Sequence, residues 1–417
     1  MRAPTIAFMM LVIATTSIVP VASQTPKGKI VAMIGGDTAA YTEIINRFTT
    51  KYPGTSVELL PAPATSAIRR EKYVTMFAAK DKSIDVLLTN CIDTSEFASA
   101  GWTMALDNAI DMKTLRDTYY PANIDSGTWN GKLYALPHTA DALHLFYRKD
   151  LLDQAGLAPP ATWDDLVKIS EKLKGVVPYG LVSSWEKGNQ FMCQFLLYAA
   201  GNGGSILSKD GNTVTLDSPE NEKALQLMTD MIHKYSIAPL DNLSLTVDDG
   251  RIIFNQGKAI FNVNWDYAWG RYQAADSVVK DKVGMAPMPV FPGKAPASVL
   301  GGWGLSVNNY SANKATAVAF ISFLSDTESI RYLLKNTSQS FSNKKIMSES
   351  SYLSVNSVFT GALSRDYGTT VSRPVTPRLA EIVDVFNQYL MPAVYNKATV
   401  KDSLKNAANR IKTVITD

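Results

Sequence analysis

The chain contains little cysteine, little histidine and almost no net charge. Its 417 residues include two cysteines and three histidines, and the formal net charge is +3. Two cysteines are too few for a disulfide framework. The histidines lack metal-ligand spacing, so we predict neither a metal nor a cofactor. No stripe of lysine and arginine interleaves with aromatic residues, which argues against a nucleic-acid partner.

Several catalytic signatures are also absent. The sequence has no Gly-x-Ser-x-Gly elbow, no His-Glu-x-x-His metal motif and no Gly-x-x-x-x-Gly-Lys phosphate loop. These absences remove the best-marked hydrolase and nucleotide-binding classes. They leave open enzymes that act through a pair of carboxylates, because the chain has 38 acidic residues.

Only the N-terminus carries a long apolar run. Arg2 precedes an apolar stretch at residues 6–21, and Val21 and Ser23 suit signal peptidase. We therefore expect a signal peptide at residues 1–23, cleavage between Ser23 and Gln24, and export to the periplasm. No cysteine lies at that cut to carry a lipid, and no later run reaches about 18 apolar residues. A retained N-terminal anchor is the alternative.

Local patterns predict an α/β protein. Strands are expected at residues 29–34, 56–60 and 84–88, with helices between them, which indicates βαβ units and a mostly parallel sheet. Asn130 and Gly131 predict a hairpin over residues 129–134. Thr162 and Ser218 are expected to begin helices, and residues 404–415 to form a terminal amphipathic helix. A mature chain of about 394 residues exceeds one core, so we expect two lobes.

Nine segments, in this order, resemble the family 1 extracellular solute-binding proteins, and within them the trehalose/maltose-binding branch. The segments are KYPG at 51–54, IDV at 84–86, EFASAGW at 96–102, LYALP at 133–137, LFYRKD at 145–150, ATWDDL at 161–166, FNQGKA at 254–259, NWDYAW at 264–269 and GGWG at 301–304. Each segment is weak alone, and their order and spacing make the resemblance strong.

The resemblance implies a two-lobed periplasmic-binding-protein fold of type II, with a ligand cleft between lobes that the chain joins in three crossings. We place the crossings near His138, Pro296 and Asp326. Lobe 1 would then comprise residues 24–138 plus 297–326, and lobe 2 residues 139–296 plus 327–417. Closure of such lobes around a ligand is a standard switching motion.

A pyranose offers flat C–H faces and a rim of hydroxyl groups, so its pocket needs aromatic surfaces and planar polar groups. Trp265 and Tyr267 follow a predicted strand, where side chains face a cleft at the carboxyl edge of a sheet. Trp303 is similar to the family's ligand-stacking tryptophan, and Gly302 would let a ligand approach the backbone. Core packing is the alternative role for both aromatic residues near 265.

Polar candidates complete the expected site. Asp141 resembles the family's acidic acceptor of sugar hydroxyls, with a solvated loop charge as the alternative. Asp37 follows Gly-Gly and would either bind ligand or cap a helix. Arg373 resembles an arginine that reaches into the cleft, with a surface salt bridge as the alternative.

The sequence also departs from the branch. Asn90 and Asp93 stand where the branch has an aspartate followed by tryptophan, and His138 replaces an aromatic residue near the hinge. We therefore predict the class of ligand, a disaccharide or related glycoside of the trehalose, maltose or sucrose type, rather than the molecule. Cys91 and Cys193 map to different lobes, and we expect Cys193 to be a buried thiol.

The resemblance implies a receptor without catalysis, a monomer that delivers sugar to the permease subunits and ATPase of an ATP-binding-cassette (ABC) importer. A secreted glycoside hydrolase is one alternative. A receptor for a non-sugar solute is another, because the same fold holds many ligands.

Overall fold

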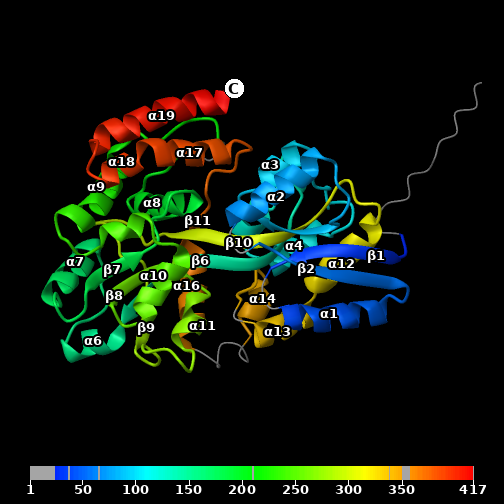
Figure 1. Cartoon of the computed structure of the whole chain (residues 1–417), viewed down its shortest axis with the longest axis horizontal. Coiled ribbons are helices and arrows are strands. Elements are labelled where there is room, and N and C mark those ends of the chain that lie inside the picture. Colours follow the sequence, from blue (N-terminus) through cyan, green and yellow to red (C-terminus); the bar gives the residue numbers. More distant parts are fainter. Residues whose placement is uncertain are drawn as a thin grey trace, which may run out of the picture.

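The computed structural model describes residues 24–35, 38–63, 66–208, 211–337, 339–349 and 357–416. The predicted signal peptide and Asp37 lie outside these residues. Two groups of elements, joined by two long strands that run across the middle of the molecule, form two lobes (Figure 1). These strands are β6 (Leu136–Arg148) and β10 (Ser298–Val307).

The first lobe surrounds one end of the sheet. Its strands are β1 (Gly28–Ile34), β2 (Thr55–Pro61) and β3 (Val86–Asn90), with a separate hairpin of β4 (Thr128–Trp129) and β5 (Lys132–Leu133). Its helices are α1 (Thr38–Lys51), α2 (Ser66–Ala78), α3 (Thr94–Ser99), α4 (Met112–Thr118), α5 (Pro121–Ser126), α12 (Lys314–Leu324), α13 (Thr327–Asn336) and α14 (Lys344–Met347).

Strand β1 shows why this end of the sheet is covered on both faces. Ala32 and Ile34 point into the core beneath α1 and α12, whereas Met33 points into the smaller core beneath α2 and α3. Successive side chains of a strand alternate between faces, so the apolar run from Ile30 to Ile34 requires helices on both sides.

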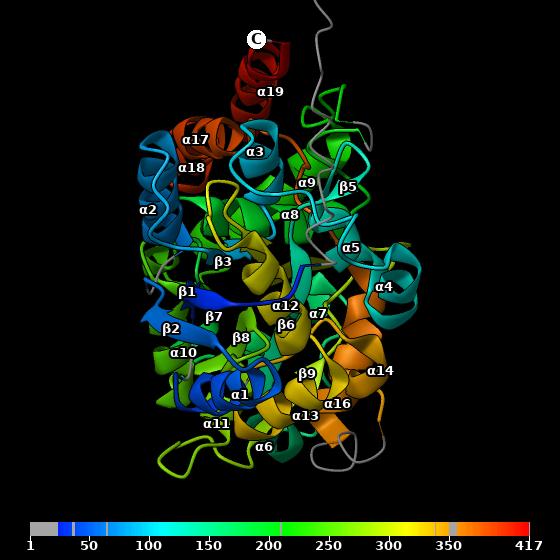
Figure 2. The same cartoon turned by 90° about the vertical axis from the view of Figure 1, so that its right-hand side faces the viewer.

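The second lobe surrounds the other end of the sheet. Its strands are β7 (Tyr179–Ser183), β8 (Ala259–Trp265), β9 (Val283–Ala286) and β11 (Thr370–Val371). Its helices are α6 (Lys149–Gln154), α7 (Trp163–Lys172), α8 (Asn189–Gly201), α9 (Pro219–His233), α10 (Val247–Asn255), α11 (Ala268–Tyr272), α16 (Ser357–Asp366), α17 (Leu379–Tyr389), α18 (Met391–Val394) and α19 (Val400–Thr416), with 3-10 turns η2 (Leu240–Leu243) and η3 (Tyr367–Thr369). Helices α17 and α19 pack on α8 and α9 at the C-terminal end of the chain (Figure 2).

The sheet is mixed, in the order β2-β1-β3-β10-β6-β8-β7. Pairs β1/β2, β1/β3 and β7/β8 are parallel, as βαβ units require. However, β6 and β10 run antiparallel to each other and to their other main neighbours. The expectation of a mostly parallel sheet therefore holds within each lobe and is wrong at the centre, where the strands join the lobes instead of returning through a helix.

Strands β6 and β10 each contribute side chains to the cores of both lobes. In β6, Ala142 belongs to the core of the first lobe and Leu143 to that of the second, four to five residues beyond His138. In β10, Val299 belongs to the core of the second lobe and Leu305 to that of the first, so β10 passes between the lobes a few residues after Pro296.

The third crossing was misplaced. Asp326 caps the N-terminus of α13, whose Ile330 and Leu333 are fully buried in the core of the first lobe. Ile346 of α14 is also part of that core. The next described helix, α16, packs on β6 and β9. The chain therefore leaves the first lobe only after α14, because the apolar stripe of α13 fits the surface of α1.

Several local predictions are confirmed. Asn130 and Gly131 have positive φ angles of 46° and 76° and join β4 to β5 in an antiparallel hairpin. The Thr162 side chain accepts a hydrogen bond from the Asp165 amide in a complete capping box, and Ser218 caps α9. Among the described residues, no helix is both long and apolar enough to cross a membrane.

Candidate functional site

The two lobe-joining strands meet at a pair of glycines. Gly301 and Gly302 of β10 lie opposite Asp141 and Ala140 of β6. A Cβ atom on Gly301 would stand 2.7 Å from Cζ3 of Trp265 and 2.9 Å from Cβ of Asp141. The missing side chain at Gly301 is therefore what allows the indole of Trp265 to lie against the hinge.

A hollow of about 330 Å³ lies beside this crossing, lined from both lobes. Its lining residues are Cys91, Ile92, Ser95, Ser126, Leu300, Ser372, Arg373, Pro374 and Val375. A second hollow of about 210 Å³ shares Cys91 and Ser126 with the first and is also lined by Thr94, Asn123, Gly127, Ala135, Pro137, Trp303 and Gly304.

Arg373 is the charged residue of the larger hollow. The residue is 6% exposed, and its guanidinium donates from Nη2 to the Leu300 carbonyl (3.0 Å) and to Cys91 Sγ (2.8 Å), and from Nη1 to Cys193 Sγ (3.5 Å). Its Nε has no hydrogen-bond partner in the described part of the chain. The predicted approach of Arg373 to the space between the lobes is consistent with this position, whereas the alternative of a surface salt bridge is wrong because the group is buried.

The two cysteines are free thiols on opposite sides of this guanidinium. Cys91 follows β3 in the first lobe and is partly exposed, whereas Cys193 lies in α8 of the second lobe and is fully buried. Burial raises the pKa of both thiols, and the charge of Arg373 acts in the opposite direction. Arg373 thus connects the lobes through hydrogen bonds rather than through a disulfide.

Trp303 lines the smaller hollow, and one face of its ring is covered. The Arg69 guanidinium lies 4.1 Å from the ring centroid, in a cation–π contact. Arg69 is buried, and its Nε and Nη1 have no partner among the described residues. Its Nη2 donates to the Pro63 carbonyl (2.9 Å), so Arg69 is held in place and leaves only the other face of the Trp303 ring free for stacking.

The acidic candidates lie near the hinge but line neither hollow. Asp93 is buried, and this burial raises its pKa to about 7 against the opposing charges of Arg70 and Arg373. Burial, and then the charge of Asp266, raises the pKa of Asp141 well above its ordinary value.

Asn90 and His138 have structural partners instead. The Asn90 side-chain oxygen accepts a hydrogen bond from the Ile92 amide (3.3 Å) and so holds the turn after β3. His138 is completely buried, with Nε2 3.0 Å from the Tyr41 hydroxyl and its ring at the edge of Phe341. Burial lowers the pKa of His138 to about 3, so its imidazole is neutral. The imidazole of His138 thus packs in the core of the first lobe, against Tyr41 and Phe341.

The aromatic residues after β8 are divided in role. Trp265 is partly exposed and donates from Nε1 to Gln190 Oε1 (3.3 Å) beside Gly301. The Tyr267 hydroxyl instead donates to Asp248 Oδ1 (3.1 Å) on α10. The structure therefore brings Trp265 to the hinge and ties Tyr267 to the second lobe.

Sequence reasoning missed Arg69, Cys91 and the serines of the larger hollow, namely Ser95, Ser126 and Ser372. Arg69 lies in an ordinary amphipathic helix, and isolated serines carry no spacing signal, so no local pattern singles them out. Among the described residues no cluster of histidine, cysteine or acidic side chains could hold a metal ion.

Comparisons with known proteins agree with this geometry. The sequence model of the family described as bacterial extracellular solute-binding protein matches residues 35–330. A probable ABC transporter-binding protein of Deinococcus radiodurans is 26% identical over 371 residues, which cover 87% of each chain. The structure of maltose-bound MalE3 of T. maritima is 32% identical, has a TM-score of 0.85, and is covered completely by 93% of this chain. A solute-binding protein of Agrobacterium radiobacter K84 in complex with ribitol is 25% identical, with a TM-score of 0.80 over 94% of this chain and 99% of that one.

Proposed function

The chain belongs to the bacterial extracellular solute-binding proteins, and we propose that it is the sugar-binding component of an ABC importer. The observation that carries this proposal is the hollow at the hinge, because residues from both lobes line it. A solute held there would contact both lobes at once. Binding would then favour the closed arrangement by its differential affinity for the closed state.

We propose a disaccharide or related glycoside as the ligand, of the trehalose, maltose or sucrose type. The likeness to maltose-bound MalE3 over the whole of that chain supports a sugar. The hollows offer an indole at Trp303 and a guanidinium at Arg373, and the acids Asp93 and Asp141 lie within electrostatic range of Arg373. The ribitol complex of a relative supports polyhydroxylated solutes more broadly.

We also propose that the mature protein begins near Gln24, acts as a periplasmic monomer, and presents its closed surface to permease subunits coupled to an ATPase. It catalyses no step itself. The division of the chain between lobes follows the cores, with residues 327–349 assigned to the first lobe.

Isothermal titration of the mature protein with maltose, trehalose, sucrose and glucose tests this function, with chromatography of each sugar afterwards. Saturable heat with intact sugar supports a receptor. Cleavage products would instead support a glycoside hydrolase, and the absence of heat from every sugar would point to a solute of another class.

A further inference from the structure

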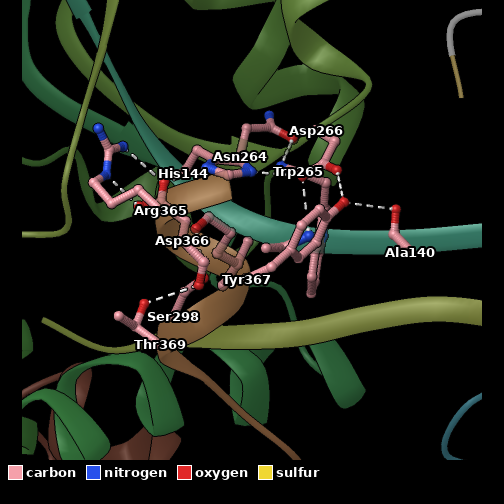
Figure 3. Close-up of polar contacts among 12 residues, drawn as sticks. Ala140, His144, Asn264, Trp265, Asp266, Ser298, Arg365, Asp366, Tyr367 and Thr369 are labelled. Carbon is pink, nitrogen blue, oxygen red and sulfur yellow. Dashed lines mark hydrogen bonds and ion pairs between the residues drawn. The ribbon is translucent and has the colours of Figure 1, made fainter. Parts of the chain in front are cut away.

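A buried cluster of charged groups lies at the hinge, outside the two hollows (Figure 3). At its centre is His144 of β6, whose ring is fully buried. Its Nε2 lies 2.6 Å from Asp266 Oδ1, and its Nδ1 lies 2.6 Å from Asp366 Oδ2. Asp266 follows β8 and Asp366 ends α16, so one imidazole connects three separate segments of the chain.

The geometry determines the charge of this imidazole. A carboxylate can only accept hydrogen bonds, and a neutral imidazole has a hydrogen on only one nitrogen. Because each ring nitrogen of His144 faces a carboxylate oxygen, both nitrogens must carry hydrogen if both acids are ionised. Arg365 keeps Asp366 ionised, since it donates to both of its oxygens at 2.6 and 2.9 Å.

The direction of the pKa shifts agrees with this geometry. Burial acts to lower the pKa of His144, but the charges and hydrogen bonds of Asp266 and Asp366 outweigh it and raise the pKa to about 9. Burial acts to raise the pKa of Asp366, but hydrogen bonds from His144 and Arg365 lower it. Two cations and two anions thus balance inside the cluster.

Other ionisable groups face the cluster from the neighbouring elements. Tyr367 of η3 contacts Asp266, and Tyr120 at the start of α5 packs 5.0 Å from the Tyr367 ring. Burial raises the pKa of Tyr120 to about 12 and holds that of Tyr367 well above its ordinary value, so neither loses its proton near neutral pH. Asp141, on β6 itself, adds a carboxyl group whose pKa is raised by burial and by the charge of Asp266.

Asp266 connects His144 to the hinge through hydrogen bonds. Its Oδ1 also accepts a hydrogen bond from the Ala142 amide (3.0 Å), and its Oδ2 accepts one from Tyr367. The Tyr367 hydroxyl also lies 3.0 Å from the Ala140 carbonyl. Asp266 directly follows Trp265, the indole at the crossing. The cluster therefore holds both the β6 crossing and the loop that carries this aromatic side chain.

We propose that His144 is a positioning residue, held as an imidazolium, which fixes Asp266 and thereby the β6 hinge and Trp265, so that ligand affinity depends on its proton. This inference rests on the proposed function for its link to affinity. The charged state of His144 does not depend on the proposed function.

The first test is ¹⁵N NMR of protein labelled only at histidine. The chain has three histidines, and His138 and His233 serve as internal references, because the first is buried and kept neutral whereas the second is exposed. We expect both nitrogens of His144 to be protonated from pH 6 to 8 and to lose one proton near pH 9. A neutral His144 at pH 7 would overturn the proposal, whatever the protein binds.

The second test measures the Kd for the sugar found by titration, between pH 6 and 10.5, for wild type, His144→Gln and the control His233→Gln. We expect the wild type and the control to lose at least tenfold in affinity above pH 9, and His144→Gln to bind at least tenfold more weakly at pH 7 with little pH dependence. Equal pH profiles in all three proteins would contradict a positioning role.

Two further outcomes are decisive. If His144→Gln fails to fold, Asp366→Asn replaces it, and we expect the loss of affinity to shift to lower pH because one anionic partner is gone. If the wild type binds no sugar at any pH, the proposed function fails and the link to affinity fails with it, whereas the NMR experiment still decides the charge of His144.

Discussion

Replacing Gly302 with alanine should destabilise the protein more than a typical surface change. Gly302 has a φ of +117°, a backbone angle that residues with a side chain rarely adopt. A Cβ atom at this position would also stand 2.4 Å from the Thr139 carbonyl oxygen. Strain at such a backbone angle costs about 1–3 kcal/mol, and overpacking costs about as much again. The clash falls on the backbone of β6, which cannot rotate away as a side chain would. We therefore expect the free energy of unfolding to fall by roughly 2–6 kcal/mol.

A matched control is available in the same chain. Gly361 lies inside α16 and is exposed, and a Cβ atom there would meet no other atom within 4 Å, so Gly361→Ala should stabilise the protein by about 1 kcal/mol. Urea denaturation followed by tryptophan fluorescence measures both variants. A Gly302→Ala protein as stable as wild type would show that β10 and β6 do not approach as described.

Two other predictions concern the site. Burial raises the pKa of Asp93 from 3.8 to about 7, so between these values the folded protein keeps a proton that the unfolded chain releases. Relative to Asp93→Asn, the wild type should therefore lose roughly 2–4 kcal/mol of its free energy of unfolding from pH 4 to 8. Denaturation curves in which both proteins have the same pH dependence would refute this. Arg373→Met should cost roughly 2–3 kcal/mol, because it removes the hydrogen bonds to Leu300 and to the thiols of Cys91 and Cys193; unchanged stability would contradict those contacts.

The sequence predicted structure best where the cause is local. The Asn130-Gly131 turn, the helix start at Thr162 and the strand at residues 29–34 each depend on neighbouring residues, and each is confirmed. The third crossing could not be predicted, because the helical pattern after Asp326 shows an apolar face but not which lobe it covers.

The residues of the site also differ in whether the sequence could predict their positions. The family resemblance implied that Trp303 and Arg373 lie near ligand, and each of them lines one of the two hollows. The burial of His138 against Tyr41, and the pairing of His144 with two acids, depend on residues distant in sequence. No local sequence pattern predicts such contacts. Because β6 is buried on both faces, its sequence indicates a strand but not which distant residues its side chains contact.

The most direct test of ligand capture between the lobes is calorimetric titration of the best-bound sugar into wild type, Ser126→Leu and Ser99→Leu. Ser126 lines both hollows, whereas Ser99 is exposed at the end of α3 and lines neither. If the solute binds at the hinge, the larger side chain at 126 should weaken binding at least tenfold and the change at 99 should leave the Kd within twofold of wild type. Full affinity in Ser126→Leu would show that the ligand binds elsewhere.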